Sequence, residues 1–518
     1  MLAFPSLLLL TGALLILLAR RRHERAWWLI AMGAALLAWL YTLSLLRAIP
    51  ARIQVSVWRP EVLFASQLEL VLDPEGWQLI YGAMTLLLAV MITAIARRGE
   101  VTAGGRAMML VHTSLALLAI LSGNMLTVAI TWALLDLTAF AFLVSISKRE
   151  DSATGLVNRL AIDGAGVLLV LGASVAQNHA PTSGGAAGAG QSPLGVVLVS
   201  LAVLLRLGLF PPHFELPALP GVRRGLGTLL RLLPAAVALS ALGRALEPGV
   251  PAAALIWLRL GGVLGVAIGG LRWVSEPEAV GGRRFLVLGL SGLGVLTATF
   301  AGASPVGVVT ATSTLVLLTG AVVSLSEIHS PVHRAWAVLA ALFCVGLPLT
   351  PGALLADALL EGLRTSADRL FAAVGLLGML LLGLGTLRRA LVPQTPWASG
   401  ERLVKILYGA GMLLPLLAGV GLSLRSASGV NVQGIAFSAG MAAVVVVAAW
   451  ISRRLEGKRL DRWRRWLTYL DPSPLYRLTW PVMRQGLRAI KAIGDLFEGE
   501  GAMLWTYVVL LLVFLAIL

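Results

Sequence analysis

Apolar runs of about 20 residues recur along the whole sequence, and this feature limits the possible folds more than any other. A run of that length crosses a bilayer as an α-helix, and a globular core has no room for so many of them. Composition agrees, because 58% of the 518 residues are hydrophobic and only 13% are charged, against about 25% in a typical soluble domain. The sequence therefore predicts an all-α, polytopic membrane protein.

The hydropathy pattern predicts about sixteen membrane spans. The predicted spans are 2–19, 26–46, 76–96, 105–121, 124–146, 154–176, 195–211, 224–243, 252–272, 283–301, 304–326, 334–362, 367–387, 403–424, 431–452 and 502–518. The first is expected to be a retained span and not a signal peptide, because no basic region precedes it and arginines follow it at once.

Basic residues predict the orientation of the spans. When the loops are assigned alternately to two sides, most lysines and arginines fall on one side, including those at 20–25, 97–106, 272–284 and 453–465. The positive-inside rule places that side in the cytoplasm. We expect a multi-pass protein of the inner (plasma) membrane with its N- and C-termini on the non-cytoplasmic side.

Segment 454–500 differs from the spans because it is rich in arginine, tryptophan and leucine and is interrupted by Pro472, Pro474 and Pro481. It is too charged to cross the membrane and too apolar for a free tail, which favours a lateral amphipathic helix on the cytoplasmic surface. Because span 502–518 anchors its far end, we expect this segment to contact other membrane subunits of a larger complex. A linker that lies on the lipid bilayer is the alternative.

The cysteine count and the charge exclude several classes of protein. The single cysteine, Cys344, cannot by itself form a disulfide, an iron–sulfur cluster or a zinc site, and we expect no cofactor and no metal. The formal charge of +16 lies in short loops, where it reports topology. Nucleic acid is therefore not an expected partner, and we find no catalytic site.

Two predicted spans contain helix breakers at depth. Pro211 and Pro212 interrupt the seventh span, and Pro348 and Pro351 interrupt the twelfth. Paired broken spans at corresponding places are typical of transporters built from inverted repeats. We therefore predict two inverted five-helix repeats, 105–243 and 252–387. The remaining parts are an N-terminal region 1–104 with three spans, a pair of spans 403–452, the lateral segment 454–500 and the terminal span 502–518.

Ionisable side chains inside spans are costly and are candidates for function. Those in the predicted spans or at their breaks are His112, Asp136, Asp163, Arg206, His213, Glu215, Arg231, Arg259, Asp357 and Glu361. Asp136 lies well inside its span and needs a partner, for which Arg206 and Arg231 are the best candidates. A static buried ion pair and a functional charge are both open interpretations.

Several stretches resemble one family in order and spacing. Residues 122–138 (SGNMLTVAITWALLDLT) resemble its fifth helix, with an Asn-Leu run that leads to Trp-Glu, and residues 157–159 (VNR) resemble the start of its sixth. Residues 209–217 (LFPPHFELP) and 346–357 (GLPLTPGALLAD) resemble its two broken-helix motifs, and residues 70–73 (LVLD) the entry to its third helix. The family is that of the antiporter-like, proton-channel subunits of complex I, multi-subunit sodium/proton antiporters and membrane hydrogenases. Sixteen spans and a lateral helix most resemble its distal, L-type member.

The resemblance implies proton or ion translocation within an oxidoreductase complex, such as an NADH-quinone oxidoreductase or a membrane hydrogenase. The family's axis of buried Glu, Lys and His residues falls in this sequence on Ala133, Arg206, Arg231, Thr312 and Ala356. Arginine does not exchange its proton near neutral pH, because its pKa exceeds about 12. Asp136, one helical turn from Ala133, restores a carboxylate on that face.

The residues expected to form an ion pathway or a buried charge axis are Asp136, Asp163, Arg206, His213, Glu215, Arg231, Thr312 and Asp357. Two readings stay open for an antiporter-like subunit: ion translocation, and a degenerate form that serves as a scaffold. A membrane subunit of an inorganic-carbon (bicarbonate) uptake pair is a further alternative, in which fixed arginines attract anions.

Overall fold

The computed structural model describes residues 1–21, 24–55, 67–96, 102–146, 150–178, 192–210, 224–276, 279–300, 302–326, 331–391, 402–426, 432–454 and 485. Its helices are α1 (Phe4–Leu18), α2 (Glu24–Ser44), α4 (Pro74–Thr93), α5 (Ala103–Ile120), α6 (Met125–Ile146), α7 (Glu150–Asn178), α8 (Pro193–Arg206), α9 (Arg224–Ala245), α10 (Ala252–Ser275), α11 (Ala279–Thr297), α12 (Pro305–Leu325), α13 (Pro331–Cys344), α14 (Pro351–Arg364), α15 (Arg369–Leu391), α16 (Arg402–Ser426) and α17 (Val432–Arg454). Two 3-10 turns, η1 (Leu45–Ala48) and η2 (Ala94–Ala96), and two strands, β1 (Ala51–Val55) and β2 (Leu68–Leu72), complete the elements of the described part.

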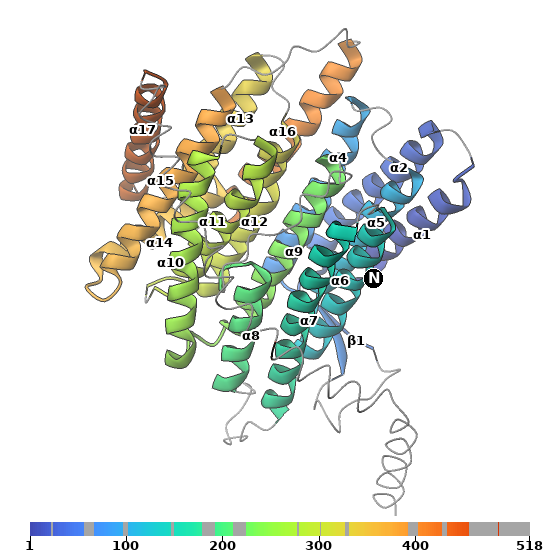
Figure 1. The fold of residues 1–518 in the computed structure, drawn as a ribbon, viewed down its shortest axis with the longest axis horizontal. Coiled ribbons are helices and arrows are strands. Elements are labelled where there is room, and N and C mark those ends of the chain that lie inside the picture. Colours follow the sequence, from blue (N-terminus) through green and yellow to red (C-terminus); the bar gives the residue numbers. More distant parts are fainter. Residues whose placement is uncertain are drawn as a thin grey trace, which may run out of the picture. The chain divides into compact units, whose positions relative to one another are not determined.

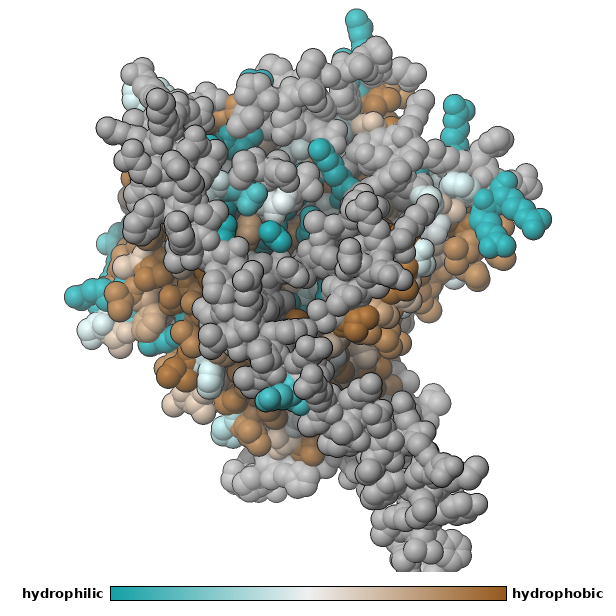
Figure 2. Space-filling model, in the orientation of Figure 1, coloured by the Kyte–Doolittle hydropathy of each residue, from teal (hydrophilic) through white to brown (hydrophobic). Residues whose placement is uncertain are grey.

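The helices pack side by side and run roughly parallel (Figure 1). Eleven of the described helices are long and apolar enough to cross a membrane. Apolar residues also cover much of the described surface visible in Figure 2, and exposed leucines such as Leu14, Leu37 and Leu417 are the kind of side chain that faces lipid. The predicted multi-pass helical fold is confirmed.

The predicted spans match the described helices one to one, with one informative exception. Span 334–362 is divided into α13 and α14, which meet at a break between Cys344 and Pro351. The lateral segment 454–500 and the terminal span 502–518 lie outside the described residues, apart from the first residue of the lateral segment and residue 485. Their predicted roles therefore stay predictions.

A β-hairpin lies between the second and third predicted spans. Strands β1 and β2 pair antiparallel, with Ile53 opposite Leu70. The hairpin also binds the turn between α5 and α6, because the Val71 N–H donates to the carbonyl of Leu121 at 2.7 Å and the Gly123 N–H to that of Glu69 at 2.8 Å. The fold is thus helical with one small sheet that fixes where α6 begins.

Both expected breaks contain the same helix ending, built on glycine. After α8, Gly208 has φ +69°, and the Leu209 N–H donates to the carbonyl of Leu204 at 2.9 Å. After α13, Gly346 has φ +81°, and the Leu347 N–H donates to the carbonyl of Leu342 at 3.2 Å. Each is the six-to-one hydrogen bond of a Schellman ending, which needs a residue in the left-handed region.

Of the prolines predicted to break the two spans, the structure describes Pro348 and Pro351. Pro348 follows the glycine ending of α13, and Pro351 is the first residue of α14, a position where a missing N–H costs nothing. Pro211 and Pro212 lie outside the described residues, and α8 has already ended before them. The two breaks share one kind of helix ending, and the two inverted repeats stay a prediction.

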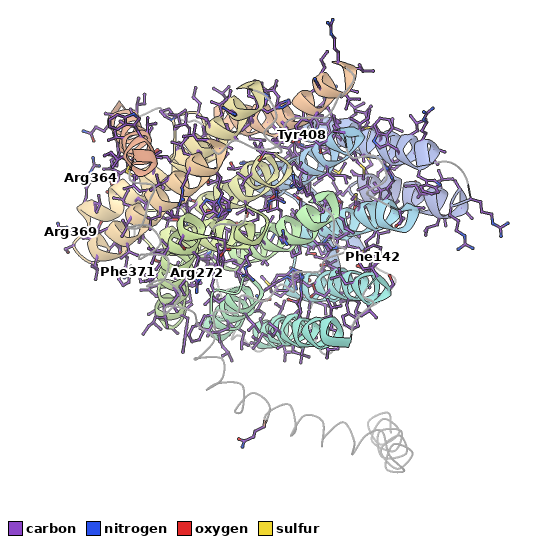
Figure 3. The ribbon with its side chains drawn as sticks, turned by 45° about the horizontal axis from the view of Figure 1, so that its top comes forward. Phe142, Arg272, Arg364, Arg369, Phe371 and Tyr408 are labelled. Atoms are coloured by element: carbon purple, nitrogen blue, oxygen red, sulfur yellow. The ribbon has the colours of Figure 1, made fainter. Side chains whose placement is uncertain are left out.

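The predicted orientation places the loop between spans 334–362 and 367–387 on the non-cytoplasmic, less basic side. Arginines nevertheless lie at that end of the bundle. Figure 3 shows Arg364 and Arg369 at the adjoining ends of α14 and α15. Arg364 contacts Glu361 at 3.1 Å and donates to the side chain of Gln433 at 2.6 Å. The predicted orientation of the chain therefore stays a prediction.

Candidate functional site: a buried charge cluster

The centre of the candidate site is an ion pair between Asp136 on α6 and Arg206 at the end of α8. The two guanidinium NH2 groups donate to the two carboxylate oxygens at 2.7 Å and 2.6 Å. The side chain of Asp136 is only 9% exposed and that of Arg206 only 2% exposed. Such a parallel, two-point contact is the strongest geometry for this pair of groups. Of the two partners considered for Asp136, the structure selects Arg206.

Local structure fixes both members of this pair. Asn124 caps α6, because its side-chain oxygen accepts from the Thr127 N–H at 2.9 Å, while its amide nitrogen donates to the carbonyl of Gln67 at 2.6 Å. On α6, Trp132 lies one turn before Asp136, and the Arg206 guanidinium sits 4.5 Å from the centre of its ring. On α8, the glycine ending at Gly208 leaves Arg206 as the last helical residue.

A second pair lies on α7. The Arg159 Nε is 3.4 Å from a carboxylate oxygen of Asp163, one helical turn away, and both side chains are largely buried. Asp136, Arg159 and Asp163 line the same small cavity. With Arg206 these groups make two acids and two arginines, so their formal charges cancel. A balanced quartet is the arrangement that a low-dielectric interior tolerates.

His112 on α5 also lines this cavity and is 1% exposed. The sequence identifies it as an ionisable residue inside a span, but the predicted charge axis does not include it. Its side chain comes from the fourth span, where the family resemblance supplied no motif. Only the packing of α5 against α6 brings it next to Asp136.

The residues expected to continue the axis through α12 lie in a different environment. Thr312, Ser313 and Thr314 are fully buried, and each hydroxyl donates to a carbonyl one turn earlier in α12 at 2.8 Å, 2.8 Å and 2.9 Å. Gly294 of α11 packs closely against Thr312 and has no space for a Cβ. The Thr312 hydroxyl therefore forms its hydrogen bond within its own helix.

The end of the predicted axis is apolar. Ala356 is fully buried in a cluster with Val345, Leu355 and Met379. Asp357, the neighbouring residue, is exposed and lies against Gly434 of α17, not in that cluster. Arg231 is half-buried on α9. His213 and Glu215 lie outside the described residues. The structure therefore brings together Asp136, Asp163 and Arg206 but not Thr312 and Asp357.

A pair of substitutions tests whether the Thr312 hydroxyl bonds only within its own helix, unlike that of Thr314. Thr312→Val is expected to change the free energy of unfolding by no more than about 1 kcal/mol, because the lost hydroxyl serves only its own helix. Thr314→Val is expected to cost more, about 1–3 kcal/mol, because Thr314 also accepts from the Gln78 amide at 3.1 Å. Thermal unfolding of the purified variants measures both. A larger effect at Thr312 than at Thr314 would contradict this assignment.

No protein-family model matches this sequence, and no curated protein matches it. Among solved structures, it is similar to a chain of the membrane-bound sulfane sulfur reductase, an archaeal respiratory membrane complex. The TM-score is 0.68 at 14% identity, over 99% of both chains. It is also similar to a chain of the Mrp complex from Dietzia sp. DQ12-45-1b, with a TM-score of 0.64 at 17% identity. That match covers all of this chain but 62% of the other.

These two comparisons establish the fold. The chain has the architecture of membrane subunits found in a respiratory complex and in the Mrp complex. The fold implied by the resemblance to antiporter-like subunits is therefore confirmed. The similarity to the L-type member in particular stays a prediction.

Proposed function

We propose that this chain is an antiporter-like membrane subunit of a larger membrane complex, in the degenerate form that scaffolds the complex and does not carry protons along its whole axis. The observation that carries the proposal is the two-point contact between Arg206 and Asp136. A relay residue must gain and lose a proton near working pH, and an arginine held by a carboxylate keeps its proton.

The second half of the bundle supports the same proposal. The position that resembles the family's central lysine is Thr312, whose hydroxyl is bound within its own helix. The position that resembles the terminal lysine or glutamate is Ala356, buried among apolar side chains. A proton that reached the Asp136 cluster would meet no titratable group at either position. Both matched solved structures are of multi-subunit membrane complexes, which supports other membrane subunits as partners of this chain. They give no support to the inorganic-carbon alternative.

Proton uptake by reconstituted complex tests the proposal. The double variant Asp136→Asn/Arg206→Met removes both charges of the pair and leaves no unpaired charge behind. The rate of proton uptake into vesicles is expected to equal that of the wild type, because the pair is not a station on a conducting path. Asp357→Asn is the matched control, since Asp357 is exposed.

A several-fold fall in proton uptake in the double variant, with the complex still assembled, would overturn the scaffold proposal and favour ion translocation. Assembly is measured separately by isolating the complex through a tag on this chain. Loss of the companion subunits in the double variant would place the pair in assembly, in line with a scaffold.

A further inference from the structure

A small cavity lies between α5, α6, α7 and α9 in the interior of the bundle. Its volume is about 20 Å³, and its polar lining comes from His112, Asp136, Arg159 and Asp163. Pro234, a proline within α9, forms part of the opposite wall. A water molecule needs about 10–15 Å³ by this measure, so the cavity has room for about one water and at most two.

His112 is the unexplained group in this lining. Its side chain is buried, and neither ring nitrogen has a hydrogen-bond partner among the residues that the structure describes. A neutral imidazole carries one donor and one acceptor. Leaving either without a hydrogen bond in the protein interior costs free energy. A water needs two to four polar partners to be held in such a place, and His112 with the two carboxylates provides them.

The charges around the cavity favour water over an ion. Asp136 is matched by Arg206, and Asp163 by Arg159. A cation or an anion added to this balanced group would be an uncompensated charge in a low-dielectric interior. A neutral dipole that both donates and accepts meets no such penalty. The described residues also contain no group of three His, Cys, Asp or Glu side chains that could hold a metal ion.

We propose that this cavity binds water and that His112 is a positioning residue, which holds the water by hydrogen bonds against the carboxylates of Asp136 and Asp163. The site is a hydrated pocket, not fully enclosed by protein, within the first half of the bundle. This inference deepens the proposed function, because it confines buried water to the α5–α9 half and leaves the region around Ala356 dry.

Silver accessibility of single cysteines tests the inference on the full chain in vesicles. Cys344, which is buried, is first replaced by alanine so that each variant carries one thiol. Two variants place the thiol at the cavity, Leu143→Cys and Ala139→Cys, and both keep His112. Ala356→Cys is the control in the apolar cluster. After exposure to silver ions, the protein is unfolded and the remaining thiols are counted with a fluorescent maleimide.

Both cavity thiols are expected to react at least roughly tenfold faster than Ala356→Cys, because a silver ion reaches a thiol only through water. It replaces the thiol proton, so the product adds no net charge to the pocket. In Ala139→Cys, adding His112→Leu is expected to slow the reaction toward that of the control, because leucine cannot hold water. That comparison separates a positioning role from a merely structural one.

Two outcomes overturn different claims. Cavity thiols that react no faster than an unreactive Ala356→Cys thiol would overturn the water site, and a reaction at Ala139→Cys unaffected by His112→Leu would overturn the role of His112. Fast reaction at Ala356→Cys would instead contradict the dry second half and so the scaffold proposal, while the water site would stand. If Leu143→Cys fails to fold, Ala139→Cys alone still decides the first point.

Discussion

Replacing Arg206 with methionine is expected to destabilise the protein by about 3–5 kcal/mol, because it leaves the Asp136 carboxylate buried without its partner. The side chains of the pair are 2% and 9% exposed, so the water of the neighbouring cavity cannot replace both the charge and the two hydrogen bonds of the guanidinium. Thermal unfolding of the purified protein, followed by tryptophan fluorescence, measures the loss. The effect is one of desolvation, and salt in the buffer is expected to change it little.

The same substitution at Arg364 is the matched control. Arg364 pairs with Glu361 at 3.1 Å, but these side chains are about half exposed, at 52% and 49%. Arg364→Met is expected to cost less than about 1 kcal/mol, as exposed pairs do. Adding Asp136→Asn to Arg206→Met should recover most of the lost stability, since no unpaired charge remains. Equal losses at Arg206 and Arg364, or no recovery in the double variant, would show that the pair is not the buried contact described.

Replacing Gly346 with alanine is expected to be about as severe, with a loss of roughly 3–5 kcal/mol from two sources. The backbone at Gly346 has φ +81°, a region that strains residues with a Cβ. An added Cβ would also lie 2.7 Å from the Met379 side chain and 2.8 Å from that of Ala356. Because α13 ends here, the substitution should disturb the start of α14 as well. Thermal unfolding of the purified variant measures this loss.

Gly33→Ala is the control for this prediction. Gly33 lies within α2, where an added Cβ would meet nothing within 4 Å. Alanine is favoured over glycine in a helix by up to about 1 kcal/mol, so this variant should be unchanged or slightly more stable. If Gly346→Ala and Gly33→Ala unfolded at the same temperature, the left-handed ending at Gly346 would be wrong.

The spans could be predicted from the sequence because they depend on local composition. A bilayer requires a long apolar helix wherever the chain crosses it. The pairing of Asp136 was also expected, because a carboxylate at that depth is too costly to leave alone. The hairpin also had a signal in the sequence. Leucine recurs at every second residue, at 68, 70 and 72, and a period of two is typical of a strand.

At the two helix breaks, the sequence prediction named the prolines but not the glycines that end the helices. The prolines at 211–212 and at 348 and 351 predicted breaks in the segments where α8 and α13 end. The glycines Gly208 and Gly346 end the helices, because only a left-handed residue completes the closing hydrogen bonds. Both stand before a leucine in the sequence, as Gly-Leu-Phe-Pro and Gly-Leu-Pro. That shared pattern was the available signal.

The sequence by itself determined that this chain is a helical membrane protein, since hydropathy is a local property. Only the tertiary structure decided which arginine holds Asp136, that Thr312 and Ala356 lie in closely packed surroundings, and that His112 shares a cavity with two carboxylates. The reason is that partners and cavities depend on distances between helices far apart in the chain. Hydropathy does not encode those distances.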